Sequence, residues 1–140
     1  RFSLTLLLFD IDSMHIINDR FGFAVGDKVI GALGRLLNKG FRNASFIGRM
    51  SGDRFAVALE NLDDSQVEKL ARQVITDFGN IQQYSTGNSF RSTISAAFSS
   101  YQNEMDLKNW FAFAEKMLME AKEKGGNQVV SSADWSGMRR

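Results

Sequence analysis

The 140-residue sequence contains no cysteine, no proline and a single histidine. The absence of cysteine excludes disulfide frameworks, cysteine-ligated zinc and cysteine nucleophiles. One histidine, His15, excludes metal sites built from several histidines and argues against a Ser-His-Asp triad. The chain also lacks a long hydrophobic run, because the longest one, at 4–9, is broken by Thr5 and followed at once by Asp10. We therefore expect no membrane contact from this segment and, by default, a cytoplasmic location.

The charges are nearly balanced, with 17 Lys and Arg against 16 Asp and Glu, which gives no sign of a nucleic-acid-binding surface. A composition of 44% hydrophobic and 24% charged residues is typical of one folded domain. We expect that domain at 1–130, followed by a small polar tail or linker at 131–140. Because the chain opens at Arg1 rather than at methionine, we expect it to be a segment of a longer protein, such as the cytosolic part of a membrane-anchored one.

The hydrophobic pattern predicts strands and helices in alternation around a central hairpin. The predicted strands are 3–10, 44–50, 54–60, 90–98 and 128–130, and the predicted helices are 13–19 and three with apolar stripes at 25–37, 67–78 and 107–121. A polar loop is expected at 79–89, and Trp110, Met117 and Met119 are assigned to the core. The order β-α-α-β-β-α-β-α-β predicts an α/β (α+β) fold with one mixed sheet and helices packed on it.

Acidic residues follow the first predicted strand and stand in the hairpin turn. Asp10 and Asp12 come at the carboxyl end of the strand, where sheet proteins often place ligands, and Mg²⁺ prefers oxygen donors. The alternative is that one of them caps the next turn while the other is solvated. Asp53 in the turn Ser51-Gly52-Asp53 serves turn geometry by default. Lying close to Asp10, it would instead complete a two-carboxylate site for a metal and a triphosphate.

Two further groups of residues have a functional and a structural interpretation. Asn18 and Asp27 have side chains that can read a purine edge, but Gly22 and Gly26 beside them are equally typical of a junction between two helices. Lys122, near the end of the last helix, is of the kind that meets phosphate, and it also complements the helix dipole.

Three segments of the chain resemble the GGDEF domain family, the diguanylate cyclases. They are DIDSMHIINDRFGFAVGD (10–27), RMSGDRF (49–55) and AEKMLMEAKEKGGN (114–127). The corresponding family patterns read approximately D-x-D-x-F-K-x-x-N-D-x-x-G-H-x-x-G-D, R-x-G-G-D/E-E-F and A-D-x-A-L-Y-x-A-K-x-x-G-R-N. The match covers most of the chain in the expected order, so the resemblance implies the family's palm-like nucleotide-cyclase fold.

Family members join two GTP molecules into cyclic di-GMP, with one GTP held by each domain of a dimer. The resemblance assigns roles residue by residue: Mg²⁺ held by Asp10, the Ile11 carbonyl and Asp53, guanine read by Asn18 and Asp27, phosphate contacted by Gly52 and Lys122, and catalysis served by Asp53. Mg²⁺ is accordingly the cofactor expected with any bound nucleotide.

Several of these positions depart from the family pattern. The departures are His15, Phe23, Ser51, Arg54 and Gly126, in place of the family's Lys, His, Gly, acidic residue and Arg respectively. The family's product-inhibition motif R-x-x-D reads Arg42-Asn43-Ala44-Ser45, so only Arg42 remains and we expect that site to be non-functional. Arg54 is the decisive change, because it changes the charge beside the expected metal by two units.

These departures favour a degenerate, catalytically inactive GGDEF domain with a regulatory or interaction role in cyclic di-GMP signalling. Such a domain would retain weak GTP binding and would work beside a protein partner or an adjacent sensor or phosphodiesterase domain. The first alternative is an active diguanylate cyclase that uses Asp10 and Asp53. The second is a protein-docking scaffold that binds no nucleotide.

Overall fold

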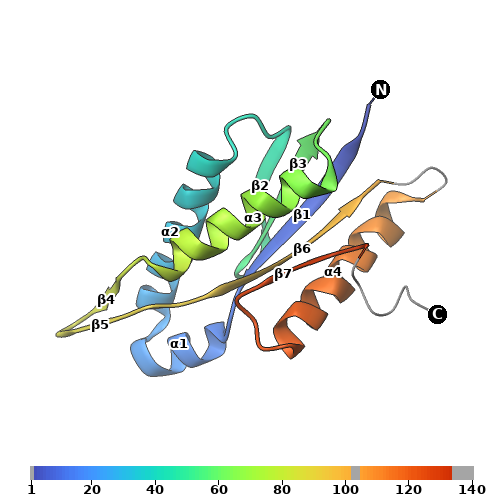
Figure 1. Ribbon diagram of the computed structural model, residues 1–140. Helices are drawn as coiled ribbons and strands as arrows, with labels where there is room; N and C mark the ends of the chain where they lie inside the picture. The colour runs from blue at the N-terminus through green and yellow to red at the C-terminus, as the bar shows by residue number, and fades with distance from the viewer. Residues whose placement is uncertain (1, 102–104, 134–140) are drawn as a thin grey trace.

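The computed structural model describes residues 2–101 and 105–133, and its centre is the first strand (Figure 1). Strand β1 (Leu4–Ile11) is buried along almost its whole length. A near-continuous apolar run of this kind is typical of a strand covered on both faces. The predicted strand at 3–10 is therefore confirmed, shifted by one residue.

The sheet has five strands in the order β2-β3-β1-β6-β7, with β1 in the middle. Strands β3 (Arg54–Glu60) and β6 (Ile94–Ser100) both pair with β1 in antiparallel register. Strand β2 (Phe46–Ser51) forms a hairpin with β3, and β7 (Val129–Ser131) pairs with β6 in parallel. The predicted mixed sheet and central hairpin are confirmed.

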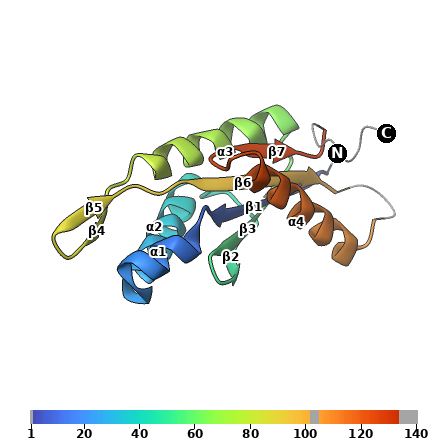
Figure 2. The same ribbon diagram turned by 90° about the horizontal axis from the view of Figure 1, so that it is seen from below.

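Helices cover both faces of the sheet because successive side chains of β1 point to opposite sides (Figure 2). Leu7 and Phe9 pack in one core with helices α1 (Met14–Phe21), α2 (Phe23–Gly40) and α3 (Asp64–Gly79). Leu6 and Leu8 pack in a second core with helix α4 (Leu107–Glu123). Asp10 follows Leu6 and Leu8 in this alternation, so it faces α4.

The structure corrects the sequence interpretation of 79–98. The predicted loop at 79–89 contains a short hairpin, β4 (Gln83–Ser85) and β5 (Asn88–Phe90), and the following strand begins at Ile94 rather than at residue 90. Two three-residue strands are too short for an alternating pattern to be recognised. Gly87 supplies the positive φ of 74° that their tight turn requires.

The C-terminal end of the described chain extends the sheet. β7 runs through Ser131, which is buried, one residue beyond the domain limit expected from sequence. The rest of the expected tail, from 134 onward, lies outside the described residues. Among the described helices, none combines the length and hydrophobicity needed to cross a bilayer.

Candidate functional site

Asp10 and Arg54 are cross-strand partners at the end of β1 and the start of β3. Arg54 Nη2 lies 3.1 Å from Asp10 Oδ2, and the Asp10 side chain is only 8% exposed. The alternative that Asp10 is exposed to solvent is therefore wrong. A charge-assisted hydrogen bond between a guanidinium and a buried carboxylate is among the stronger polar contacts in proteins.

Lys122 approaches the same carboxylate from helix α4. Its Nζ lies 3.2 Å from Asp10 Oδ2 and donates to the Ile11 carbonyl oxygen at 3.0 Å. The sequence interpretation offered phosphate or the helix dipole as partners of this lysine. In the structure the ammonium instead contacts Asp10 Oδ2 and the Ile11 carbonyl oxygen, the two groups of β1 that the resemblance assigns to Mg²⁺.

Glu115 completes the cluster and was not identified from sequence. Its Oε2 lies 2.7 Å from Arg54 Nη1, so the guanidinium bridges β1 and α4. Glu115 and Lys122 are seven residues apart, which places them on one face of the helix. That spacing was visible in the sequence, but nothing indicated that this face meets Arg54.

Asp53 stands in the turn between β2 and β3 and contacts Asp10. Burial, a hydrogen bond with the Asp10 side chain and the negative charge of Asp10 raise the pKa of Asp53 from 3.8 to about 6, against the opposing effect of Lys122. The predicted proximity of the two carboxyl groups is thus present. The raised pKa of Asp53 thus results first from burial and then from the neighbouring Asp10 carboxyl group.

Mg²⁺ does not fit this arrangement as it stands. Asp10 Oδ2 already accepts from Arg54 and Lys122, and the Ile11 carbonyl accepts from Lys122. Within residues 2–101 and 105–133, no group of three or more acidic or histidine side chains is arranged to hold a metal ion. Asp10 Oδ1 is buried and, while Asp53 is ionised, has no hydrogen-bond donor in the described part of the chain, but one free oxygen does not offset two adjacent cations.

Asp12 has a structural role rather than a solvated one. It accepts hydrogen bonds from Thr93 Oγ1 and Ser95 Oγ, both at 2.7 Å, and from the Asn127 backbone N–H at 2.8 Å. Gly126 lies against it with a φ of 71°, and a Cβ there would be 2.7 Å from Asp12 Oδ2. The absence of a side chain at 126 therefore makes room for the Asp12 carboxylate.

Asn18 and Asp27 lie on the two helices that follow β1. Asn18 Oδ1 is packed against Gly26, where an added Cβ would overlap it, and this oxygen has no hydrogen-bond partner among the described residues. Asp27, next to Gly26 in α2, is exposed. The close packing of Asn18 on Gly26 supports the interpretation as a junction between two helices, and the purine interpretation stays a prediction.

The remaining predicted positions are dispersed. His15 and Phe23 are exposed, and Ser51 and Gly52 belong to the exposed end of the β2–β3 hairpin. Arg42 lies beyond α2, near Ser45, whose hydroxyl donates to Glu60. Glu60 ends β3 while Arg54 begins it, so Arg42 is roughly 20 Å from the cluster at about 3.3 Å per strand residue.

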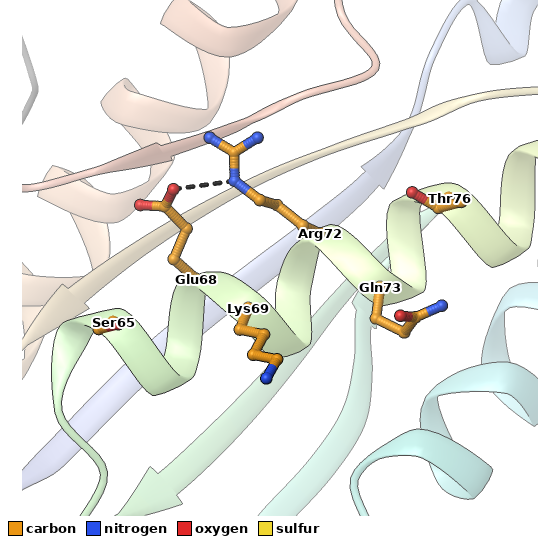
Figure 3. Close-up of a pocket in the computed structure, with 6 residues that line it drawn as sticks. All are labelled: Ser65, Glu68, Lys69, Arg72, Gln73 and Thr76. Atoms are coloured by element: carbon orange, nitrogen blue, oxygen red, sulfur yellow. Dashed lines mark hydrogen bonds and ion pairs between the residues drawn. The ribbon is translucent and has the colours of Figure 1, made fainter.

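A separate hollow of about 480 Å³ runs along the exposed side of α3 (Figure 3). Its side chains come from one helix, and Arg72 Nε pairs with Glu68 Oε2 at 2.8 Å across one turn. It contains none of the predicted site residues. Exposed pairs of this kind contribute little to stability, so we assign it no function.

Comparison with known proteins identifies the family. Residues 1–128 match the family described as "Diguanylate cyclase, GGDEF domain". "Diguanylate cyclase A" of Treponema denticola is 31% identical over 131 residues, which cover 93% of this chain and 35% of that protein. The chain thus spans about a third of the length of this curated relative.

Solved structures of GGDEF domains are similar to this chain in fold. The active GGEEF domain of a diguanylate cyclase from Vibrio cholerae is 27% identical with a TM-score of 0.83, over 92% of this chain and 82% of that one. The GGDEF domain of DgcB from Caulobacter crescentus, solved with c-di-GMP, has a TM-score of 0.90 at 21% identity, covering 94% and 79%. The second likeness shows the fold alone. On the family match over 1–128, this chain belongs to the GGDEF domain family of diguanylate cyclases.

Proposed function

We propose that this chain is a degenerate GGDEF domain that does not make cyclic di-GMP and that acts as a regulatory or interaction module in cyclic di-GMP signalling. The observation that carries the proposal is the Arg54 guanidinium, 3.1 Å from Asp10. A unit charge about 4 Å from another interacts by roughly 4 kcal/mol at an effective dielectric of about 20. A divalent ion bound to Asp10 would meet this repulsion from Arg54 and again from Lys122.

The cluster also has fewer acidic groups than a two-metal site requires. The family pattern has a carboxylate where this chain has Arg54, and metal ions in pairs are held by several shared carboxylates. Asp10, Asp53 and Glu115 stand against the charges of Arg54 and Lys122, so the net formal charge is −1 at most. That leaves less acidic charge for two divalent ions than the family pattern provides with a carboxylate at position 54.

We further propose that Asn18 and Asp27 recognise a base. The exposed Asp27 carboxylate is an acceptor that matches the N–H donors at the edge of guanine. Asn18 Oδ1 is a second acceptor, but it is buried against Gly26 and has to turn outward to meet a base. We therefore propose that guanine nucleotides bind through Asn18 and Asp27, weakly, because the phosphate end lacks its metal. Mg²⁺ should add little to that binding.

The proposed role depends on sequences outside this chain. A domain that binds guanine nucleotide without turning it over can report nucleotide level or dock a partner. We propose that it works beside a sensor or phosphodiesterase domain or with a separate protein partner. Reading the whole gene is the direct check.

The first experiment is an assay of the purified chain with GTP and Mg²⁺, followed by chromatography for cyclic di-GMP. We expect no product, and Arg54→Glu alone should restore little, because His15 and Gly126 still depart from the family pattern. Sustained production by the unmodified chain would reject the proposal in favour of an active cyclase using Asp10 and Asp53.

The second experiment is calorimetry with GTP, GDP and cyclic di-GMP. We expect weak GTP and GDP binding that Asn18→Ala abolishes and that is the same with and without Mg²⁺. Exposed Asp19→Asn, one residue away, is the matched control. No heat with any of the three nucleotides would favour the docking scaffold.

A further inference from the structure

A separate cavity lies between helix α1 and the segment 90–93 that leads into β6. It has a volume of about 280 Å³ and is lined by Arg20, Arg91 and Ser92 among others. We propose that this α1 cavity binds a phosphate-type oxyanion, either inorganic phosphate or the phosphoryl group of a small phosphomonoester.

Two arginines beside the cavity have no acidic partner among the residues that the structure describes. Arg20 and Arg91 line the same cavity, and neither forms an ion pair anywhere in the described part of the chain. Both arginines are exposed residues at the edge of the cavity, and an anion between two like charges reduces their repulsion. The planar guanidinium donates two parallel hydrogen bonds that match phosphate oxygens, which makes arginine well suited to this ligand.

Ser92 gives a second reason for placing an oxyanion in this cavity, and this reason does not depend on charge. This residue lines the cavity, is only 6% exposed, and its Oγ has no hydrogen-bond partner among the described residues. A buried hydroxyl left unpaired is destabilising, and an oxyanion in the cavity would accept its hydrogen. The neighbouring hydroxyls of Thr93 and Ser95 are both satisfied by Asp12, so the unpaired hydroxyl is particular to Ser92.

Asp12 also lines the cavity, but its charge is already engaged. Its two carboxylate oxygens accept from Thr93, Ser95 and the Asn127 N–H at 2.7 to 2.8 Å. The cavity therefore keeps a net formal charge of +1 from Arg20, Arg91 and Asp12. The stacked rings of Phe21 and Phe90, with centroids 4.3 Å apart, form an apolar wall that strengthens electrostatic contacts beside it.

This cavity is distinct from the proposed guanine site. Arg20 follows Asn18 by two residues, which places the two side chains about 200° apart around the helix at about 100° per residue. Its volume is below the roughly 300 Å³ at which drug-sized ligand pockets begin, so it suits a phosphate with a small substituent rather than a whole nucleotide.

The test is a nuclear magnetic resonance titration of the ¹⁵N-labelled chain with sodium phosphate, with ionic strength held constant by sodium chloride. We expect saturable shifts of the Arg20 and Arg91 Nε–Hε signals and of the Ser92 amide. Arg20→Gln and Arg91→Gln should each weaken binding about tenfold, the loss expected for one charge-assisted hydrogen bond. Arg35→Gln, which removes an exposed arginine on α2, is the control and should change nothing.

Shifts that do not saturate, or that survive in the Arg20→Gln, Arg91→Gln double variant, would overturn the proposal. Ser92→Ala gives a second measurement that does not depend on the arginines. It should raise the melting temperature of the phosphate-free chain, by removing an unpaired hydroxyl, while weakening phosphate binding. If phosphate binds Ser92→Ala as tightly as the parent chain, the assignment is wrong.

The source of the oxyanion is distinguished by repeating the titration with glycerol 3-phosphate. Tighter binding than inorganic phosphate would identify a phosphomonoester as the ligand, and weaker binding would identify the free ion. Both outcomes presuppose saturable binding at Arg20, Arg91 and Ser92.

Discussion

Arg54 on β3 places its guanidinium on the Asp10 carboxylate of β1, with Nη2 and Oδ2 3.1 Å apart and with the two residues directly opposite in the antiparallel register. The pairing follows from the sheet itself, since cross-strand neighbours on one face are within side-chain reach. Any residue at position 54 therefore lies beside Asp10. This relationship makes position 54 the natural place to test the charge of the site.

Arg54→Glu should convert the cluster into a metal-responsive one. The variant places a third carboxylate beside Asp10 and Asp53, so it should be destabilised without metal and recover on addition of Mg²⁺. At a concentration ten times the dissociation constant, the melting temperature should rise by about 3–5 °C. Differential scanning fluorimetry with and without Mg²⁺ measures this effect.

Two controls show whether the Mg²⁺ effect depends on the charge at position 54. Arg54→Gln removes the positive charge without adding a carboxylate and should show a much smaller Mg²⁺ effect. The parent chain should show none. An equal rise in the parent chain would mean that Arg54 does not keep the ion out.

Asp53 should make stability depend on pH. Its pKa is about 6 in the folded chain and 3.8 when unfolded, so the folded state binds more protons between these values. The free energy of unfolding contributed by this group is therefore fully present below pH 3.8 and is lost as the pH rises through 6. Asp53→Asn cannot ionise, so its melting temperature relative to the parent should increase from pH 4 to pH 7.

The matched control for that titration is Asp19→Asn, on the exposed side of α1. The change in relative melting temperature between pH 4 and pH 7 should be larger for Asp53→Asn than for this control. An equal change in both variants would show that the carboxyl titrates normally. The Asp53 Cγ resonance, followed directly, should have its midpoint near pH 6.

Gly126→Ala should lower the free energy of unfolding, because the added Cβ would lie too close to the Asp12 carboxylate. Gly126 and Gly87 have similar positive φ values of 71° and 74°, but a Cβ at 126 would be 2.7 Å from Asp12 Oδ2, whereas nothing lies within 4 Å at 87. Gly87→Ala isolates the conformational cost of about 1 kcal/mol. Gly126→Ala should cost about 2–3 kcal/mol in urea unfolding, because steric strain adds to it. Equal costs would contradict the close packing of Asp12.

Lys122→Met should destabilise the chain although it keeps most of the side-chain volume. The variant removes a cation from Asp10 and leaves the Ile11 carbonyl without its lysine donor. We expect a loss of about 1–3 kcal/mol, the range for an unpaired buried polar group. Lys116→Met, at an exposed position of the same helix, should change stability by less than about 0.5 kcal/mol. Similar values for both would show that the ammonium contributes nothing at β1.

Local sequence patterns were sufficient for most of the fold and for part of the site. Asp63 caps α3 in a capping box with Gln66, a local feature that requires only two residues three apart in the chain. The hairpin β4–β5 was missed because its strands have three residues each. Met119, assigned to the core, is 56% exposed, whereas Met117 and Trp110 are buried as predicted.

Local patterns along the chain predicted the order of the helices and of the five strands of the main sheet, the family resemblance and a cation at position 54. The groups that this cation contacts follow from the packing of elements far apart in the chain. Arg54 meets Asp10 across 44 residues of chain and Glu115 across 61, while Lys122 reaches the Ile11 carbonyl across 111. Periodicity reports which side of an element is apolar, but contacts over such separations arise only when the elements pack, and the charge balance of the site depends on them.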